Sequence, residues 1–578
     1  MTLMRYAEII DRILLRRGVT DNNREAFLNP SYNNHVHDPF LLLNMEKVVE
    51  RLEKAIASNE KIVIYSDYDC DGIPGAVVAV DFFRKLGIPV EFYPHTNHDD
   101  GAQSADGTSS SWSGVRVYIP HRHDEGYGLH MDAVEGFVKN GVTLLITIDL
   151  GITAIAETAY AQKNNLDVII TDHHEPHDEL PPAFAILNPK QKGDTYPWKG
   201  LCGTGVFFKL VCAYIKKYGE ARNIPAGSEK WMLDMVGLAT LADMVPLQDE
   251  NRVFAKFGLM VLRKTRRPGL VSLARAMRMD MTELTEDDVT FMIAPRLNAA
   301  SRMESPQLAF ELLSTTDTVR ARALAEQLTA INDSRKTIVA GIMKHVHADM
   351  EKREVKDVIV VGNPDWRVGV LGLVAGKLLE QYDRPVFVWG KEGGDVIKGS
   401  CRGNGTVHVV DLMKEAGDIF LGYGGHEGAG GFSIDEQGIL VLEEKLIEAY
   451  GKIKKEKGDT VDKFEEEATL DLVSKDFISE LLQLAPFGFE NTKPIFKFSG
   501  ITVTDMVPFG KKKEHLTVHV EQNGQKRKAF SFFLTEDALP KHVSVGSIVT
   551  VLGSIDRSVF MGREEIRIRI VAFPEIER

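Results

Sequence analysis

Asp67-Tyr68-Asp69-Cys70-Asp71-Gly72 is the stretch that decides the fold. The apolar run at residues 61–66 predicts a buried strand before it, and residues 73–86 predict a helix after it. Three carboxylates therefore stand at the carboxyl end of a strand, where open α/β sheets bind their ligands. Such closely spaced charges repel unless a cation neutralises them, and hard divalent cations prefer oxygen ligands. The stretch predicts a metal site, although a solvated Asp/Gly turn or a calcium loop would share this pattern.

Two further predicted strands end in the same kind of residue. Residues 142–148 lead into Asp149, and residues 166–171 lead into Asp172-His173-His174. The alternation of strands and helices favours a parallel sheet, in which the carboxyl ends of neighbouring strands meet at one edge. An isolated pair of histidines would more often be structural or exposed. Next to two other acidic strand ends, the pair is predicted to join a shared ligand set.

A further carboxylate, Asp243, lies near the end of the apolar segment 231–245, which predicts a buried helix. An acid in such surroundings is unfavourable unless it is paired or ligating. The alternative is an exposed acid at the helix end. The candidate metal ligands are therefore Asp67, Asp69, Asp71, Asp149, Asp243 and the histidine pair His173 and His174.

Two other segments carry residues suited to phosphate. Arg296, Asn298 and Arg302 cluster near a predicted helix start, and Arg122 follows another strand among histidines. Arginine binds phosphate through paired donors, although these arginines could instead pair with the acidic site. Glycine-rich sequence around residues 399–403 and 422–431 would allow close approach of an anion. This sequence adds Ser400, Arg402 and His426 to the candidate phosphate ligands.

With 578 residues the chain is too long for one core. The pattern predicts a catalytic α/β domain with an N-terminal helical scaffold at 1–315, a long connecting helix at 316–353 and a second α/β domain at 354–457. A charged linker at 454–467 leads to a β-rich domain at 465–578, and a flexible loop is expected at 97–114.

The β-rich domain shows five short strand patterns, which suggest a small barrel such as the OB fold. Its basic residues lie among Phe509, Phe530 and Phe532, a mixture that suits single-stranded nucleic acid. Basic hairpin tips over a phenylalanine core would give the same pattern. The candidate contacts are Lys511, Lys512, Lys513, Lys526, Arg527 and Lys528.

Composition narrows the class of protein. No apolar run approaches the roughly 20 residues of a membrane span, and the first residues do not resemble a signal peptide. The four cysteines have no disulfide or metal-ligand spacing, so we expect a cytoplasmic protein. The net charge of −14 argues against a uniform coat on nucleic acid but permits a local basic channel.

Together these motifs resemble the RecJ family of the DHH phosphoesterase superfamily, which is named for the triplet present here at 172–174. The similarity extends over nearly the whole chain, from the acidic turn at 67–72 through the motifs at 120–128, 148–151, 241–246, 296–302, 399–402 and 424–426 to the segment 486–491. The chain departs from the family at Cys70, Ser301, Arg367 and Gly403. None of these positions is an expected metal ligand.

The resemblance implies a single-strand-specific 5′→3′ DNA exonuclease of repair and recombination that releases 5′-mononucleotides. It implies two metal ions, Mn²⁺ or Mg²⁺, with Asp149 bridging them and His174 left to bind phosphate or assist the leaving group. It also implies a monomer that works with single-stranded DNA, a single-strand-binding protein and a RecQ-type helicase. The rival hypotheses are a DHH hydrolase of small phosphodiesters, which would not need the barrel, and a non-catalytic DNA-binding scaffold, whose metal motifs would be broken.

Overall fold

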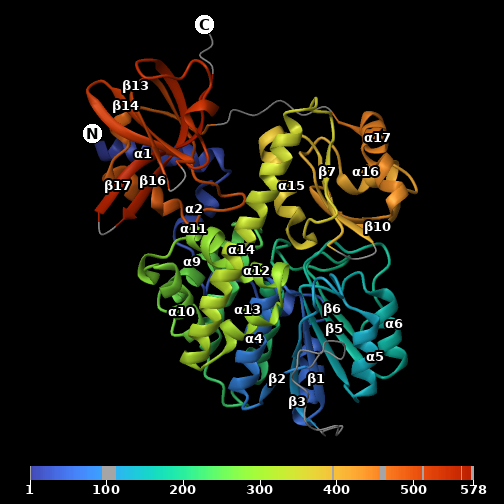
Figure 1. Ribbon diagram of the computed structural model, residues 1–578. Helices are drawn as coiled ribbons and strands as arrows, with labels where there is room; N and C mark the ends of the chain where they lie inside the picture. The colour runs from blue at the N-terminus through green and yellow to red at the C-terminus, as the bar shows by residue number, and fades with distance from the viewer. Residues whose placement is uncertain are drawn as a thin grey trace. The chain divides into compact units, whose positions relative to one another are not determined.

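The computed structural model describes residues 2–93, 112–392, 396–455, 464–510, 513–560 and 563–574 (Figure 1). The chain divides into two compact units. One contains residues 38–243 and 258–459, and the other contains residues 1–37, 244–257 and 460–578. Within the described ranges, no helix combines the length and the apolar character that a membrane span requires.

The first sheet of the larger unit is entirely parallel, as predicted, with the order β2-β3-β1-β4-β5-β6. Its strands are β1 (Lys61–Ser66), β2 (Val90–Phe92), β3 (Gly114–Tyr118), β4 (Leu144–Ile148), β5 (Asp167–Thr171) and β6 (Ala185–Leu187). The central strands are buried on both faces, which explains their continuous apolar runs. The predicted loop at 97–114 lies outside the described residues except for its last three positions.

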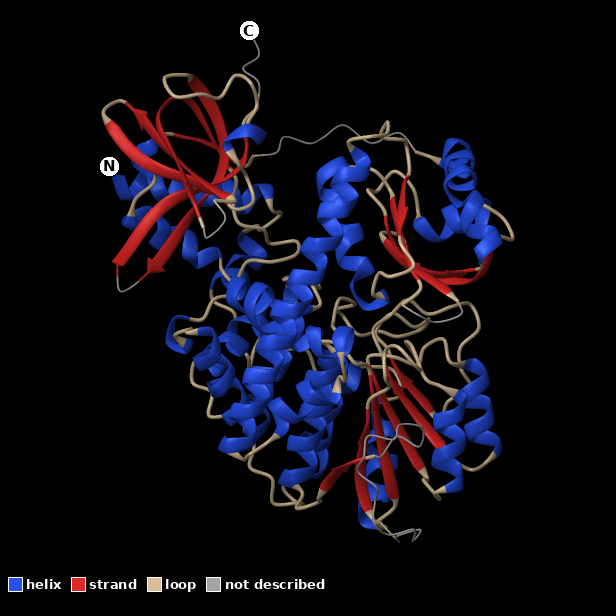
Figure 2. Cartoon of the chain, viewed as in Figure 1, coloured by secondary structure: helices blue, strands red, loops and turns tan. Residues whose placement is uncertain are grey.

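Helices cover both faces of this sheet (Figure 2). One face packs on α5 (Met131–Lys139) and α6 (Ile155–Lys163) through a shared apolar core. The other contacts α4 (Gly72–Lys85) and α7 (Gly203–Tyr218). Because helices close both faces, only the edges and the loops at the strand ends are open to a ligand.

The second sheet of the larger unit has the order β10-β11-β9-β8-β7 and is mixed. Its strands are β7 (Ile359–Gly362), β8 (Val386–Gly390), β9 (Ile397–Arg402), β10 (Phe420–His426) and β11 (Ala429–Ile434). The helix α15 (Leu371–Tyr382) contacts β8 and β9, while α16 (Val409–Glu415) contacts β10 and β11. The glycine-rich sequence at 422–431, which we expected to allow close approach of an anion, lies in the strand pair β10 and β11. Glycine has a low strand propensity, so side-chain patterns under-predict strands held by main-chain pairing.

The long helix predicted between the two α/β domains is α14 (Thr318–Met350). Its first half packs on α10 (Pro268–Met277), α12 (Ala294–Met303) and α13 (Gln307–Ser314), as Figure 1 also shows. Its second half shares an apolar core with α15. The helix is thus part of both domains of this unit.

The smaller unit contains the predicted OB-type barrel. Five strands close on themselves in the order β13-β14-β15-β17-β16, because β16 pairs back onto β13. They are β13 (Phe496–Phe509), β14 (His515–Gln522), β15 (Gln525–Ser531), β16 (Ile548–Phe560) and β17 (Arg563–Ala572). Most of the expected linker, residues 456–463, lies outside the described residues.

The N-terminal helices differ from our prediction. We assigned residues 1–315 to the catalytic domain, but α1 (Thr2–Arg16) contributes Tyr6, Ile9, Ile10 and Ile13 to the core of the barrel unit. Residues 244–257 belong to this unit as well. An amphipathic helix shows only that one face is buried, not which domain covers it.

Candidate active site

The acidic residues of three strand ends form one row. In the pairing register, Ser66 lies opposite Ile148, which lies opposite Thr171. The next residue of each strand is Asp67, Asp149 or Asp172. The amide of Asp67 donates to the carbonyl oxygen of Ile148 at 3.1 Å, and that of Asp149 donates to Thr171 at 2.9 Å. The parallel pairing therefore continues to the acids themselves and fixes their spacing.

The residues predicted to bind metal come together in overlapping groups. Asp67, Asp69 and Asp149 offer oxygen atoms that lie within 4.8 Å of one another. Asp71, His173 and Asp243 form a second such group, and Asp149 with both histidines forms a third. Nε2 of His173 lies 3.2 Å from Asp149 Oδ1 and 3.7 Å from Asp243 Oδ2. Asp149 is thus a member of the first and third groups and lies beside His173 of the second.

Backbone amides hold Asp71 in place. Its two carboxylate oxygens accept hydrogen bonds from the amides of Gly203 at 2.6 Å and Thr204 at 2.8 Å, at the start of α7. A β-carbon on Gly203 would lie 2.4 Å from that of Asp149, so only glycine fits. Sequence reasoning missed these two residues, and the only signal was a Gly-Thr-Gly run before an apolar helix.

The burial of these carboxylates is costly without a cation. Burial, followed by repulsion from neighbouring carboxylates, raises the pKa of Asp67, Asp149 and Asp243 well above the usual value. Oδ1 of Asp67 is buried and accepts no hydrogen bond. Burial, followed by the charge of His174, lowers the pKa of His173 to about 4, which leaves a neutral imidazole able to ligate. This donor set of oxygens and one imidazole fits hard divalent cations.

His174 is held by a residue that we did not predict to be functional. Asp172 is completely buried, and its Oδ1 lies 2.7 Å from Nδ1 of His174. Burial alone would lower the pKa of His174, but the hydrogen bond to Asp172 raises it. The hydroxyl of Tyr127 lies 3.2 Å from the same nitrogen. Asp172 and Tyr127 both lie in motifs that carried the family resemblance, but the sequence did not indicate that they contact His174.

Three of the predicted phosphate-binding arginines gather near the carboxylates. The guanidinium of Arg122 lies 4.9 Å from the centre of the Tyr68 ring. Burial, followed by the positive charges of Arg122, Arg335 and Arg402, lowers the pKa of Arg302 to about 9. The negative charge of Asp69 acts in the opposite direction and raises the pKa of Arg302.

The second sheet contributes Ser400, Arg402 and His426. In the register of β9, β11 and β10, Arg402 lies opposite Ala429, which lies opposite His426. The side chains of Arg402 and His426 therefore lie on the same face of the sheet, and that of Ser400, two residues before Arg402 on β9, lies on this face as well. Burial, followed by the charges of Arg402 and His174, lowers the pKa of His426. The charges of Arg402 and His174 thus both act on His426.

Arg296 and Asn298 also lie on α12, closer to its N-terminal end than Arg302 is. One guanidinium nitrogen of Arg296 donates to the carbonyl oxygen of Met292 at 2.7 Å. Its Nε and the Oδ1 of Asn298 are buried without a hydrogen-bond partner. The sequence grouped these residues with Arg302, and the structure does not place them in contact with the acidic cluster.

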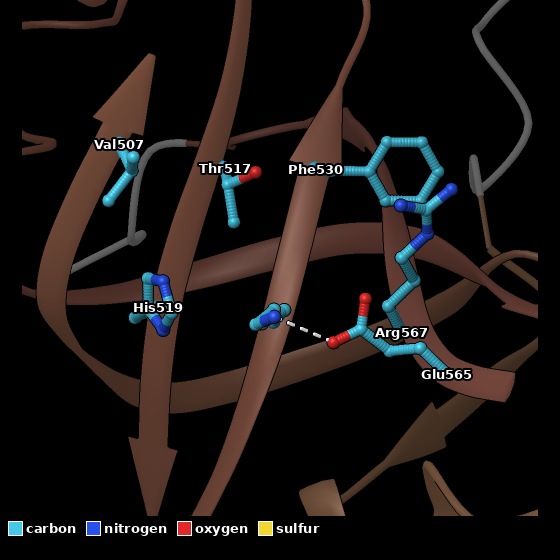
Figure 3. A pocket seen from close by; sticks show the side chains of 7 residues that line it. Val507, Thr517, His519, Phe530, Glu565 and Arg567 are labelled. Carbon is cyan, nitrogen blue, oxygen red and sulfur yellow. Dashed lines mark ion pairs between the residues drawn. The ribbon is translucent and has the colours of Figure 1, made fainter. Parts of the chain in front are cut away.

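The basic residues predicted on the barrel have varied surroundings. Lys511 and Lys512 lie outside the described residues. Arg527 donates to the carbonyl oxygen of Val473, and Lys526 lies 3.5 Å from Glu521. Lys528 lines a pocket of about 220 Å³ on the outer face of β14, β15 and β17, where it pairs with Glu565 at 2.7 Å (Figure 3).

Arg567 and Phe530 form the other wall of this barrel pocket. The guanidinium of Arg567 lies 3.7 Å from the centre of the Phe530 ring, and its Nε is buried without a partner. Phe532 lies 5.3 Å from Phe530, and His515 lies 5.2 Å from Phe532. Arg567 and His515 were missed because their aromatic neighbours come from other strands.

Family models match three parts of the chain. The DHH family, N-terminal domain, matches residues 61–240, the DHHA1 domain matches residues 355–456, and the RecJ OB domain matches residues 464–572. These ranges correspond to the two sheets of the larger unit and to the barrel.

Full-length comparisons agree with these models. The chain is 32% identical over 566 residues to the single-stranded-DNA-specific exonuclease RecJ of Bacillus subtilis, covering 97% of this chain and 67% of that protein. It is 32% identical over 447 residues to the exonuclease of the same name in Haemophilus influenzae, covering 74% of this chain and 72% of that one. The crystal structure of RecJ in complex with Mn²⁺ from Thermus thermophilus matches with a TM-score of 0.77 and 25% identity, over 100% of this chain and 78% of that chain. By sequence and by fold, the chain belongs to the RecJ family of DHH phosphoesterases.

Proposed function

We propose that this protein is a metal-dependent exonuclease that degrades single-stranded DNA from its 5′ end and releases 5′-mononucleotides. The observation that carries this proposal is the meeting of the carboxylates that follow the strand ends with His173. The charges of Arg122 and Arg302 interact with those of the acidic cluster, and neither arginine forms an ion pair with a carboxylate among the described residues. The proposal agrees with the names of the relatives, which are single-stranded-DNA-specific exonucleases. Repair and recombination are the processes that supply such strands.

Two divalent cations, Mn²⁺ or Mg²⁺, fit the donor set. Asp67 or Asp69 would hold one of them, and Asp71, His173 and Asp243 the other, while Asp149 would contact both. When bound, the ions would lower the pKa of a water nucleophile and screen the negative charge of the phosphate oxygens. The relatives' structures were determined with manganese and with magnesium, which supports this choice of metals.

The residues around the metal ligands orient the substrate and the second histidine. Asp172 holds the ring of His174 through Nδ1, so Nε2, which lies 3.5 Å from the Tyr127 hydroxyl, would donate a hydrogen bond to the scissile phosphate or to the leaving oxygen. Arg122 and Arg302 on one side, with Ser400, Arg402 and His426 on the other, would bind the terminal and scissile phosphates. A terminal phosphate carries more charge than an internal one, so these residues would favour a strand end.

The barrel would hold the rest of the strand. Its pocket joins a guanidinium, an ammonium and a phenylalanine ring on the β14–β15 face, which OB folds use for oligonucleotides. Stacking on aromatic rings requires unpaired bases, which would favour single strands. Lys528, Phe530 and Arg567 would therefore be the barrel residues that contact the strand.

The cellular setting belongs to the same proposal. None of the four cysteines forms a disulfide, which is compatible with the reducing cytoplasm that we propose for this protein. A monomer would suffice, because every proposed site is formed by residues of one chain. A single-strand-binding protein and a RecQ-type helicase are the partners that would supply unwound strands.

The decisive experiment follows a single-stranded oligonucleotide labelled at its 3′ end. With Mn²⁺ we expect stepwise shortening from the 5′ end, and no cleavage with EDTA or with the Asp149→Ala variant. Failure of the folded, metal-loaded protein to cut the strand would contradict the proposal. Cleavage of small phosphodiesters alone would then favour the small-substrate hydrolase, and DNA binding without any cleavage would favour the scaffold.

A further inference from the structure

A buried asparagine continues the row of residues at the strand ends of the first sheet. In the pairing register, Thr171 of β5 lies opposite Leu187 of β6, and the amide of Asp172 donates to the carbonyl oxygen of Leu187 at 3.1 Å. The residue that follows Leu187 is Asn188, whose side chain is completely buried. Unlike the three aspartates of the row, it carries no charge that a metal ion would neutralise. The proposed mechanism therefore leaves the fourth residue of this row without a role.

Both polar atoms of the Asn188 side chain have partners. Nδ2 donates to the carbonyl oxygen of His174 at 2.9 Å, and Oδ1 accepts from the amide of Lys190 at 2.9 Å. The first partner can only accept and the second can only donate, so the two contacts fix the orientation of the side-chain amide. The side chain thus makes one contact within its own loop and one with the loop that follows β5.

Asp172 holds the other side of the loop that follows β5. Its Oδ1 accepts from the amides of His173 at 2.7 Å and His174 at 3.1 Å, and lies 2.7 Å from Nδ1 of the His174 ring. Its Oδ2 accepts from the amide of Ile152 at 2.9 Å. Asp172 therefore holds the amide and the ring of His174, while Asn188 holds its carbonyl group. Two buried side chains at the ends of neighbouring strands thus fix this histidine from both sides.

An ion pair between the same two loops contributes less. Nζ of Lys190 lies 2.9 Å from Glu175, whose side chain is 81% exposed. Such a pair stabilises little, because water screens the charges and both long side chains lose freedom when they are ordered. The Asn188 side chain is completely buried, where water does not compete for its hydrogen bonds. We therefore assign the support of His174 from this side to Asn188 and not to Lys190.

The loop after β6 has other support besides the Asn188 side chain. The buried side chain of Gln191 donates through Nε2 to the carbonyl oxygen of Ile186 at 2.9 Å, and its amide donates to the carbonyl oxygen of Asn188 at 3.1 Å. Nδ2 of Asn44 also donates to Ile186, at 3.2 Å. A change of the Asn188 side chain would thus remove the contact with His174 while these bonds remain.

We propose that Asn188 is a positioning residue for His174, and that it fixes the backbone of the histidine so that the ring meets the phosphate at the metal site. This inference rests on the proposed exonuclease function. A reacting group displaced by about 1 Å costs roughly 100-fold in rate, and changes to residues that orient the groups of a metal site cost about 10- to 100-fold. The loss should fall on kcat rather than on KM, because the side chains proposed to bind the strand are unchanged.

The test replaces Asn188 by serine in the full-length protein and follows a 3′-labelled single strand at saturating Mn²⁺. The serine hydroxyl can still accept from the amide of Lys190 in a turn of the same kind, but it is too short to reach His174. We expect Asn188→Ser to lose roughly 10- to 100-fold in kcat with little change in KM. Asn188→Ala should show the same loss of activity and a lower Tm.

Gln191→Ala is the matched control, because it also removes a buried amide group from this loop. The partner of that amide is Ile186 of β6 and not a histidine. We expect the control to lower Tm about as much as Asn188→Ala does and to leave kcat unchanged. A purely structural role of Asn188 would make these two variants alike in both measurements and would overturn the inference.

A double-mutant cycle shows whether Asn188 acts through the histidine. In the His174→Ala background, Asn188→Ser should cause no further loss, because the ring that it positions is absent. Single-turnover rates with the enzyme in excess keep these slow variants measurable. A full additional loss in that background would contradict the proposal, and so would an Asn188→Ser variant with the kcat of the wild type.

Hydrogen exchange separates this inference from the exonuclease proposal. In Asn188→Ser the amides of His173 and His174 should exchange faster than in the wild type, whereas Gln191→Ala should leave them unchanged. If that result were obtained with a wild type that cuts no strand, the exonuclease proposal would fail while the support of His174 by Asn188 would stand. Exchange at the wild-type rate in Asn188→Ser would exclude this support, whatever the activity.

Discussion

Gly203 faces Asp149 so closely that a β-carbon on the glycine would lie 2.4 Å from the β-carbon of the aspartate. We predict that Gly203→Ala displaces Asp149 from the metal-binding cluster. Overpacking of this kind costs about 1–3 kcal/mol, and a ligand displaced by about 1 Å costs roughly 100-fold in rate. Thermal unfolding and kcat/KM on single-stranded DNA would measure both effects.

The control for this variant is Gly205→Ala, two residues along the same helix. There a β-carbon would lie 3.5 Å from its nearest neighbours, the Sγ atom of Cys202 and a methyl carbon of Leu201. This is ordinary contact, so the variant should retain both activity and stability. An active Gly203→Ala variant would show that the α7 terminus does not position Asp149.

Repulsion among the carboxylates predicts a variant that is inactive but more stable than the wild type. Asp149→Asn removes one buried negative charge while keeping the shape of the side chain. We expect it to abolish cleavage but to raise Tm in EDTA, by about 2–4 °C for each kcal/mol of repulsion relieved. In the wild type, Mn²⁺ should supply the same stabilisation, because only the folded state binds it at this site.

Thermal unfolding with and without Mn²⁺ tests this prediction. The stabilisation by Mn²⁺ should be large for the wild type and small for Asp149→Asn. A variant that is less stable than the wild type in EDTA would show that the acidic cluster is not strained without metal. Asp132→Asn, an acid in the first turn of α5 and outside the cluster, serves as the control.

The strand ends of the first sheet could be predicted because two independent signals coincide there. Apolar runs mark β1, β4 and β5, and each run stops at an acid. Parallel pairing then requires that Asp67, Asp149 and Asp172 meet at one edge. Local sequence and topology thus predicted most of the residues that meet in the acidic cluster.

Contacts made across the fold could not be predicted in this way. Gly203 and Thr204 bind Asp71 from 132 and 133 positions away in the chain. Asn188 lies outside the motifs that we singled out in the sequence, so its contact with His174 could not be predicted either. The association of α1 with the barrel depends on which apolar surface covers it, and helix periodicity carries no information about that partner.

The barrel pocket leads to a prediction about salt dependence. Arg567→Gln should weaken binding of a long single strand and lower the slope of log K against log[salt] by about 0.7, the value for one phosphate contact on a single strand. Phe530→Leu should weaken binding without changing that slope, because stacking involves no counterion release. Fluorescence anisotropy at several salt concentrations would separate the two effects.

Because α1 lies in the core of the barrel unit, the barrel is tested by point variants rather than by its removal. Arg557→Gln is the matched control, since Arg557 lies on β16 and contacts Glu564 at 2.7 Å, away from the pocket-lining residues. It should bind as the wild type does. An Arg567→Gln variant with the wild-type slope would exclude this pocket as a phosphate contact.

The ion pair between Arg51 and Glu60, at the amino ends of strands β1 and β4, links stability to pH. The guanidinium of Arg51 lies 2.8 Å from Glu60, whose other donor is the hydroxyl of Thr143 at 2.7 Å. Burial alone would raise the pKa of Glu60, but the hydrogen bonds from Arg51 and Thr143 lower it below the usual value. Glu60 therefore stabilises the fold above its unfolded pKa of about 4.3, and this stabilisation is lost as the pH falls through the lower folded pKa.

Glu60→Gln should accordingly destabilise the protein most at neutral pH, by about 1–3 kcal/mol for the loss of hydrogen bonds to a charged group. The difference in Tm from the wild type should shrink as the pH falls below about 4, where the wild-type carboxylate also becomes neutral. Glu46→Gln removes a surface ion pair to Lys217 on a side chain that is 61% exposed and should change Tm little at any pH. A Glu60→Gln difference that stays constant between about pH 7 and about pH 3.5 would show that the Glu60 side chain acts through packing, since packing does not depend on the charge of the carboxylate.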